Sequence, residues 1–106
     1  MSYRFMRIVV FFDLPTITDR DRREYRRFRK LLIKNGFFMM QESVYTRMVL
    51  NQSVKNAVID MLERNKPEAG LVQALVVTEK QYATMINIQG EIKSDVLDTD
   101  ERLVFL

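Results

Sequence analysis

Asp13 is the carboxylate in this sequence whose position best suits chemistry. It follows a largely apolar run that ends in Phe11 and Phe12, and it precedes Leu14 and Pro15. Rigid scaffolds present functional side chains where a strand gives way to a loop, so Asp13 is a candidate catalytic or metal-binding group. An aspartate that forms a turn or a cap before proline explains the same position equally well. No second carboxylate lies on this run, and a single aspartate is a poor metal site.

The residue types that are missing narrow the chemistry further. The 106 residues include no Cys, no His and no Trp. This excludes disulfides, zinc sites built from thiolates or imidazoles, thiol nucleophiles, Ser-His-Asp triads and cleavage of RNA by paired histidines. What remains is chemistry by carboxylates, hydroxyls, lysines or a hard metal such as Mg²⁺ or Mn²⁺ held by oxygen ligands.

Twofold symmetry offers the second carboxylate that one chain lacks. In a homodimer, a symmetry axis near the end of the first strand would bring two copies of Asp13 together. Mg²⁺ keeps several of its waters and can supply hydroxide to a phosphodiester without histidine, so two carboxylates suit it. We therefore predict a metal site made of Asp13 from both protomers, with Mg²⁺ or Mn²⁺ as the cofactor.

Positive charge is concentrated between residues 19 and 34. This segment holds eight cations against three carboxylates, a net charge of +5, while the whole chain carries +3 and the remainder therefore −2. Tyr25, Phe28 and Leu32 have the spacing of a buried helical stripe, and the cations point away from it. A solvated helix face is the plain alternative, but six of the eight cations are arginines, which bind phosphate at two points. The predicted nucleic-acid contacts are Arg22, Arg26, Arg27, Arg29 and Lys30.

Apolar patterning predicts the elements that position these groups. Residues 4–12 are nearly continuously apolar, which is typical of a central strand buried on both faces. A helix is predicted over 19–35, with Thr18 or Asp19 as its N-cap and Gly36 as the left-handed residue after its end.

The middle of the chain predicts a hairpin, a second helix and a fourth strand. Residues 37–41 and 43–50 form the hairpin, Ser53 caps the helix that ends before Pro67, and 71–78 form the strand. The resulting order βαββαβ predicts an α+β fold, a ferredoxin-like sandwich with two helices on one face of an antiparallel sheet.

The end of the chain is predicted to take part in a dimer. We expect residues 1–80 to form the ferredoxin-like core and residues 81–106 to be an extension that completes the sheet of a homodimer. Within the extension, 82–89 predict a short fifth strand. After an acidic spacer the apolar end, 103–106, is expected to add as an edge strand to the partner protomer.

The sequence predicts a cytoplasmic protein without a membrane partner. Arg7 and Asp13 interrupt the first apolar run, no small-residue cleavage site follows it, and it therefore differs from a signal peptide. No segment approaches the roughly 18 to 20 apolar residues of a membrane span. A chain without cysteine also suits a reducing compartment.

Four stretches of the sequence together resemble one known family. They are Ile8 to Pro15, Tyr25 to Leu32, Asn35 to Phe37, and Gln41 to Tyr45. The combination resembles the CRISPR-associated Cas2 family, the smaller of the two core spacer-acquisition proteins. The basic helix and the long acidic extension with an apolar end resemble the subgroup found in type II systems.

This resemblance implies a ferredoxin-like homodimer with metal-dependent endonuclease activity toward RNA or double-stranded DNA. It also implies a dimer that bridges copies of the larger integrase, Cas1, and supports the DNA fragment being inserted. Asp13 matches the metal-binding aspartate of the family, and Phe12 stands where many members carry tyrosine, so a hydroxyl is lost there. Ser43 and Tyr45 belong to the hairpin motif, where strand packing is favoured over a role beside the site.

Three classes of function are therefore compared: an endonuclease, a non-catalytic DNA-binding adaptor, and a small-molecule-sensing regulatory domain on the same fold. The charged helix and the lack of glycine-rich phosphate or effector loops count against the third. The first two are compatible with one another.

Overall fold

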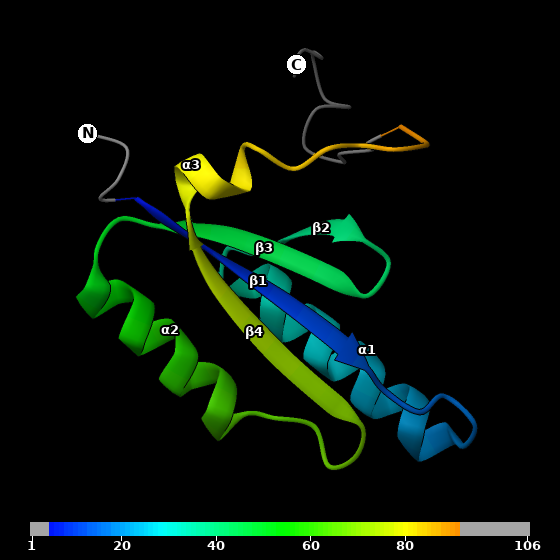
Figure 1. The fold of residues 1–106 in the computed structure, drawn as a ribbon. Helices are drawn as coiled ribbons and strands as arrows, with labels where there is room; N and C mark the ends of the chain where they lie inside the picture. Colours follow the sequence, from blue (N-terminus) through cyan, green and yellow to red (C-terminus); the bar gives the residue numbers. More distant parts are fainter. Residues whose placement is uncertain (1–4, 92–106) are drawn as a thin grey trace.

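The apolar run at the start of the chain forms the central strand of a four-stranded antiparallel sheet (Figure 1). The structure is a computed structural model and describes residues 5–91. Its strands are β1 (Met6–Asp13), β2 (Phe38–Gln41), β3 (Val44–Val49) and β4 (Leu71–Thr78). They lie in the order β2-β3-β1-β4, so the central position predicted for the first strand is confirmed. The strand runs one residue further than predicted, because Asp13 still pairs with Leu71.

Two amphipathic helices pack on one face of this sheet, and a single helical turn follows the last strand. The helices are α1 (Asp19–Lys34), α2 (Gln52–Arg64) and α3 (Glu79–Tyr82). Thr18 caps α1: its hydroxyl accepts from the Asp21 amide at 3.0 Å, and the Asp21 carboxylate accepts from the Thr18 amide at 3.1 Å. Gly36, with φ of 88°, follows the C-terminal end as predicted. The α+β class and the antiparallel sheet are therefore confirmed.

The predicted cap of the second helix was wrong. Asn51, rather than Ser53, is the N-cap of α2, because its side-chain oxygen accepts from the Val54 amide at 2.9 Å. The helix then begins at Gln52, and Ser53 lies inside its first turn. Asparagine and serine cap helices about equally well, so the residue that comes first after the strand decides the start.

The fifth strand predicted over 82–89 is also absent from the described residues. Tyr82 closes α3 instead, and residues 83–91 belong to no strand in the described part of the chain. A strand needs a neighbouring backbone with which to pair, and α3 turns the chain away from the line of β4. The acidic spacer beyond residue 91 and the predicted edge strand 103–106 lie outside the described residues.

The core lies between the sheet and the two long helices. Ile8, Val10 and Phe12 of β1 point to this side and are buried, and the remaining buried members are Leu14, Phe28, Leu32, Phe37, Tyr45, Val49, Val58 and Leu62. The Phe12 ring meets those of Phe28 and Tyr45 with centroids 5.5 Å and 5.6 Å away. Alternation along β1 therefore sends the odd-numbered residues, Asp13 included, to the opposite face of the sheet.

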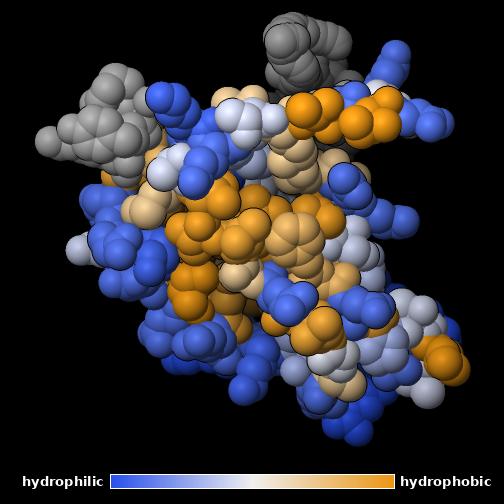
Figure 2. Space-filling model, in the orientation of Figure 1, coloured by the Kyte–Doolittle hydropathy of each residue, from blue (hydrophilic) through white to orange (hydrophobic). Residues whose placement is uncertain are grey.

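That opposite face, called the open sheet face below, remains partly uncovered. On this face the register of β1 with β3 and β4 places Phe11 beside Val44 and Gln73, and Val9 beside Thr46 and Leu75. Phe11 is 40% exposed and Leu75 is 53% exposed, and the other large apolar residues exposed on this face are Phe38, Met48 and Leu71. Figure 2 shows these hydrophobic side chains gathered over the strands, with polar residues around them. A contiguous apolar surface of this kind marks a site of association.

Candidate nucleic-acid interface and carboxylate site

Asp13 stands exposed at the end of the central strand. Neighbours hold its backbone on both sides, because Asp13 pairs with Leu71 of β4 and the Phe12 amide donates to the Ser43 carbonyl at 3.1 Å. Phe12 points into the core, so the Asp13 side chain projects from the open sheet face. A rigid strand thus presents this carboxylate to solvent at the margin of an apolar surface.

Gly70 allows β4 to begin directly against this strand end. Its φ is +94°, and a Cβ atom there would lie 2.6 Å from the Asp13 carbonyl oxygen and 2.8 Å from Cδ2 of Leu14. Only glycine fits both the backbone angle and the space. Nothing in the local sequence pattern indicates that Gly70 packs against Asp13.

One chain does not contain a complete metal site within its described residues. No group of three acidic, histidine or cysteine side chains in residues 5–91 is close enough together to hold an ion. Asp13 supplies a carboxylate of the kind that Mg²⁺ prefers, and within residues 5–91 no cluster of such side chains completes a metal site around it. The oxygen donors of the Asp13 carboxylate suit a hard metal such as Mg²⁺ or Mn²⁺.

Half of the cations on α1 have partners within the chain. Arg22 donates to the Thr16 and Ile17 carbonyls at 3.1 Å and 2.8 Å and also pairs with the Asp19 carboxylate. It therefore holds the loop that follows β1 and leads into the helix, and it can contact phosphate only with its remaining donors.

Arg27 and Arg20 join α1 to the segment after α2. Arg27 donates to the Glu24 carboxylate at 3.2 Å and to the Asn65 carbonyl at 3.1 Å, while Arg20 pairs with Glu68 at 2.8 Å. The hydrogen bond from Arg27 lowers the pKa of Glu24, and the hydrogen bond and charge of Glu68 raise the pKa of Arg20. These contacts hold the surface of the helix against the segment that follows α2.

Arg29 contacts the hairpin motif. Its Nε donates to the Tyr45 hydroxyl at 2.7 Å, and the Tyr45 ring is fully buried beside Phe12. Ser43 lies half-buried and accepts from Phe12 through its backbone. The structure therefore places Phe12 and Tyr45 on the helix side of the sheet, away from the Asp13 side chain.

A row of cations remains free along the outer face of α1. Arg23, Arg26, Lys30 and Lys34 are exposed and make no hydrogen bond or ion pair within the described range 5–91. Their spacing of three, four and four residues keeps them on one side of the helix over about 16 Å. This free cation row includes Arg26 and Lys30 from the predicted contacts, and it adds Arg23 and Lys34.

The sheet separates the free cation row from Asp13. The row faces outward from α1 on one side, and the carboxylate projects from the open sheet face on the other. Figure 1 shows that the N-terminal end of α1 lies near the end of β1, so the two features approach each other only there. A single chain therefore does not bring the predicted phosphate contacts and the predicted catalytic carboxylate into one pocket.

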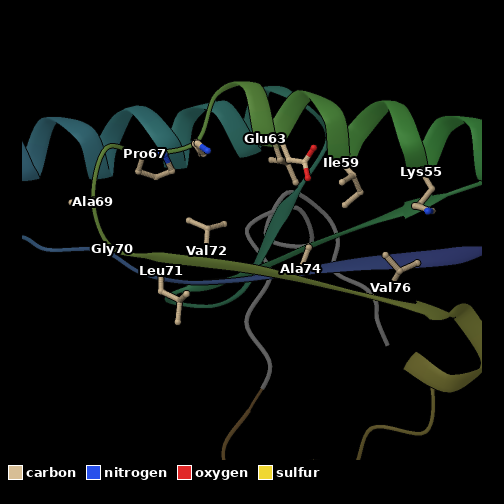
Figure 3. Close-up of a pocket in the computed structure, with 12 residues that line it drawn as sticks. Lys55, Ile59, Glu63, Pro67, Ala69, Gly70, Leu71, Val72, Ala74 and Val76 are labelled. Carbon is tan, nitrogen blue, oxygen red and sulfur yellow. The ribbon is translucent and has the colours of Figure 1, made fainter.

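An apolar groove lies between α2 and β4. It measures about 640 Å³, and Ile59 of α2 and Val72, Ala74 and Val76 of β4 line it (Figure 3). Among the described strands only β1 pairs with β4, so the outer backbone edge of β4 has no neighbour in this part of the chain. Groove and edge together leave room for a further apolar strand.

These features define a small α+β domain with a basic helix and one exposed carboxylate at the end of its central strand. The chain matches the family model described as CRISPR associated protein Cas2 over residues 6–85, and it belongs to that family. No helix in residues 5–91 is long and apolar enough to span a bilayer.

Relatives of high identity match nearly the whole chain. A Treponema denticola protein named CRISPR-associated endoribonuclease Cas2 is 55% identical over 101 residues, which is 95% of this chain and 100% of the relative. A Streptococcus mutans (serotype c, strain UA159) protein of the same name is 46% identical over 95% of this chain and 93% of its own. A solved structure described as "Crystal structure of cas2" shares the fold with a TM-score of 0.60 at 20% identity, covering 95% of this chain and 99% of that one.

Proposed function

We propose that this chain acts in CRISPR adaptation as a ferredoxin-like homodimer that binds nucleic acid and hydrolyses its phosphodiester bonds. The observation that carries the proposal is the exposed Asp13 carboxylate at the rigid end of β1, on the margin of the uncovered apolar sheet face. Membership of the Cas2 family supports the CRISPR role, and the name endoribonuclease given to its relatives supports cleavage of RNA.

A second copy packed on the open sheet face would complete the site. Such a dimer would bury Phe11, Leu71 and Leu75, and a twofold axis near the end of β1 would bring the two Asp13 side chains together. The C-terminal extension of each chain could then occupy the groove and free edge of β4 in its partner. This arrangement covers apolar surface that a chain of this size cannot cover alone.

The two Asp13 carboxylates would hold Mg²⁺ or Mn²⁺. When bound, such a metal supplies an activated water and neutralises charge on the phosphate. The chain has no histidine to act as a base, and in this proposal the metal activates the water while Asp13 holds the metal. The free cation row would hold the flanking nucleic-acid backbone, RNA or double-stranded DNA, through its phosphates.

Replacement of Asp13 tests the catalytic proposal. Asp13→Asn keeps the shape of the side chain and removes its charge, so we expect cleavage of RNA and duplex DNA to fall at least ~100-fold in the presence of Mg²⁺. Binding of the same nucleic acids should change little, because the free cation row is intact. Undiminished cleavage by a rigorously purified variant would remove Asp13 from the mechanism.

A non-catalytic adaptor is the second candidate, and the separation of Asp13 from the free cation row favours it. An adaptor needs only the dimer and its basic surface to bridge copies of the larger integrase, Cas1, and to support the inserted DNA. Spacer acquisition measured in cells that carry Asp13→Asn distinguishes the two functions. Normal acquisition would assign the cellular role to the adaptor, and lost acquisition would assign it to the carboxylate.

A further inference from the structure

Arg7 is a charged residue buried on an otherwise apolar part of the open sheet face. Its neighbours on that side of β1 are Val9 and Phe11, yet Arg7 is only 9% exposed. A buried guanidinium is costly unless it is paired and hydrogen-bonded. Its position therefore requires partners that hold it specifically.

The carboxylate and the nearest aromatic ring that contact Arg7 come from α3, one turn of helix beyond the end of β4. Its Nε donates to Oε1 of Glu79 at 3.0 Å, and its Nη2 donates to Oε2 of the same carboxylate at 2.5 Å. The Tyr82 ring lies 4.3 Å from the guanidinium carbon, and Phe38 of β2 lies 5.9 Å from it. Glu79 and Tyr82 are three residues apart and so share one side of α3. The guanidinium is thus held at its edge by a carboxylate and on its face by an aromatic ring.

A helix as short as α3 depends on such contacts. Its four residues cannot offset the cost of helix nucleation, so the turn needs support from elsewhere. The Thr78 hydroxyl accepts from the Gln81 amide at 2.9 Å, and the Gln81 side chain accepts from the Thr78 amide at 2.9 Å. These local bonds cap the turn, and Arg7 fixes its orientation against the sheet.

The orientation of α3 decides where the chain goes next. β4 ends at Thr78, beside Met6 at one edge of the sheet, whereas residues 83–91, called the C-terminal arm, lead toward β2 at the other edge. Phe38 and Met39 of β2 line a groove of about 540 Å³ together with Met85 of the arm. Figure 1 shows α3 above the end of the sheet and the arm continuing over β2.

We propose that Arg7 is a positioning residue that sets the path of the C-terminal arm and so aims it at the second copy. The arm presents Ile86 and Ile88, which are 78% and 88% exposed, and a partner chain would cover them. This rests on the proposed homodimer. Without the contacts of Arg7 with Glu79 and Tyr82, α3 unwinds. The arm that follows α3 then has no fixed direction.

Protease protection tests this role within a single chain. Lys80 lies in α3, so a lysine-specific protease reports whether the turn is open. Glu79→Gln leaves the guanidinium without its charged partner, and we expect cutting after Lys80 to become at least ~10-fold faster. The matched control is Asp60→Asn, which breaks the exposed Arg64–Asp60 pair on α2 and should leave cutting after Lys80 unchanged. Unchanged protection in Glu79→Gln would overturn the proposal.

A charge exchange separates positioning from simple loss of stability. Combining Arg7→Glu with Glu79→Arg restores an ion pair at the same place, and protection should return to within ~3-fold of the original chain. Failure of the exchange to restore any protection would contradict a specific pairing role.

The effect of Arg7 on dimerisation is measured separately. Concentration-dependent mass by light scattering should show at least ~10-fold weaker dimerisation for Glu79→Gln than for Asp60→Asn. Lost protection with unchanged dimerisation would contradict the claim that Arg7 aims the arm at a second copy. A parent chain that stays monomeric would remove the proposed homodimer, and the protease result would still stand because its contacts lie within one chain.

Discussion

The end of β1 shows how a single distant residue shapes a candidate site. Asp13 was recognisable from the sequence, because an apolar run followed by Asp-Leu-Pro marks the end of a strand. Gly70 was not recognisable in the same way, since its need to be glycine arises from the Asp13 carbonyl 2.6 Å from where its Cβ would be. Local patterns identify residues that do chemistry more readily than residues that make room for them.

Gly70→Ala should therefore destabilise the fold. Both the left-handed backbone and the clash with Asp13 oppose the added methyl group, and we expect a loss of about 2 to 3 kcal/mol in the free energy of unfolding. Urea unfolding measures this loss. Gly90→Ala is the matched control, because its φ is +93° but no atom lies within 4 Å of the new Cβ, and it should cost about 1 kcal/mol. Equal losses for the two variants would contradict close packing at Asp13.

The arginines of α1 also show that a local sequence pattern does not reveal contacts with distant residues. Periodicity correctly assigned them to the outer faces of a helix, but it could not tell which would be engaged. The partners of Arg27 and Arg29 are the Asn65 carbonyl and the Tyr45 hydroxyl, which are far away in the sequence and close only in the fold. The free cation row therefore emerges from the structure rather than from spacing alone.

Among the elements, those with local signals were predicted well. The cap, the apolar stripe and the terminal glycine of α1 all lie within the helix or beside it, and they predicted its ends to within a residue or two. The prediction of a fifth strand was wrong. The apolar residues near Met85 and Ile88 resemble a strand in the sequence, whereas in the fold Arg7 contacts Glu79 and Tyr82, and these residues form α3. A contact across the whole chain overrides a weak local pattern.

The free cation row leads to a prediction about the salt dependence of binding. Glutamine at Arg23, Arg26, Lys30 and Lys34 should reduce the slope of log affinity against log salt by about 3 to 4 per chain on duplex DNA, because each phosphate contact releases counterions. Titrations by fluorescence anisotropy between low and moderate salt measure that slope.

The control uses cations of α1 that already have partners. Glutamine at Arg20, Arg22, Arg27 and Arg29 removes the same formal charge, but these side chains are held by Glu68, Asp19, Glu24 and Tyr45. We expect a smaller change in slope for this set. A change as large as that of the free cation row would place the nucleic acid across both sides of the helix.

At the scale of the molecule, two features of the single chain are incomplete, and a second copy would complete both. The open sheet face leaves Phe11 and Leu75 exposed, and the described residues provide Asp13 with no carboxylate cluster that could hold a metal. A second copy packed on that face would cover the apolar surface and supply a second Asp13. Neither feature could be measured from the sequence, because exposure and the absence of neighbouring acids are properties of the fold.

The most direct test of the shared site is the cleavage activity of mixed dimers. Parent and Asp13→Asn chains are refolded together at a range of ratios with the total concentration constant, and cleavage of RNA or duplex DNA is measured with Mg²⁺. If both copies of Asp13 are needed, activity should follow the square of the parent fraction, so that about a quarter remains in an equal mixture. A linear decline, with about half remaining, would show that each copy acts alone and would contradict the paired site.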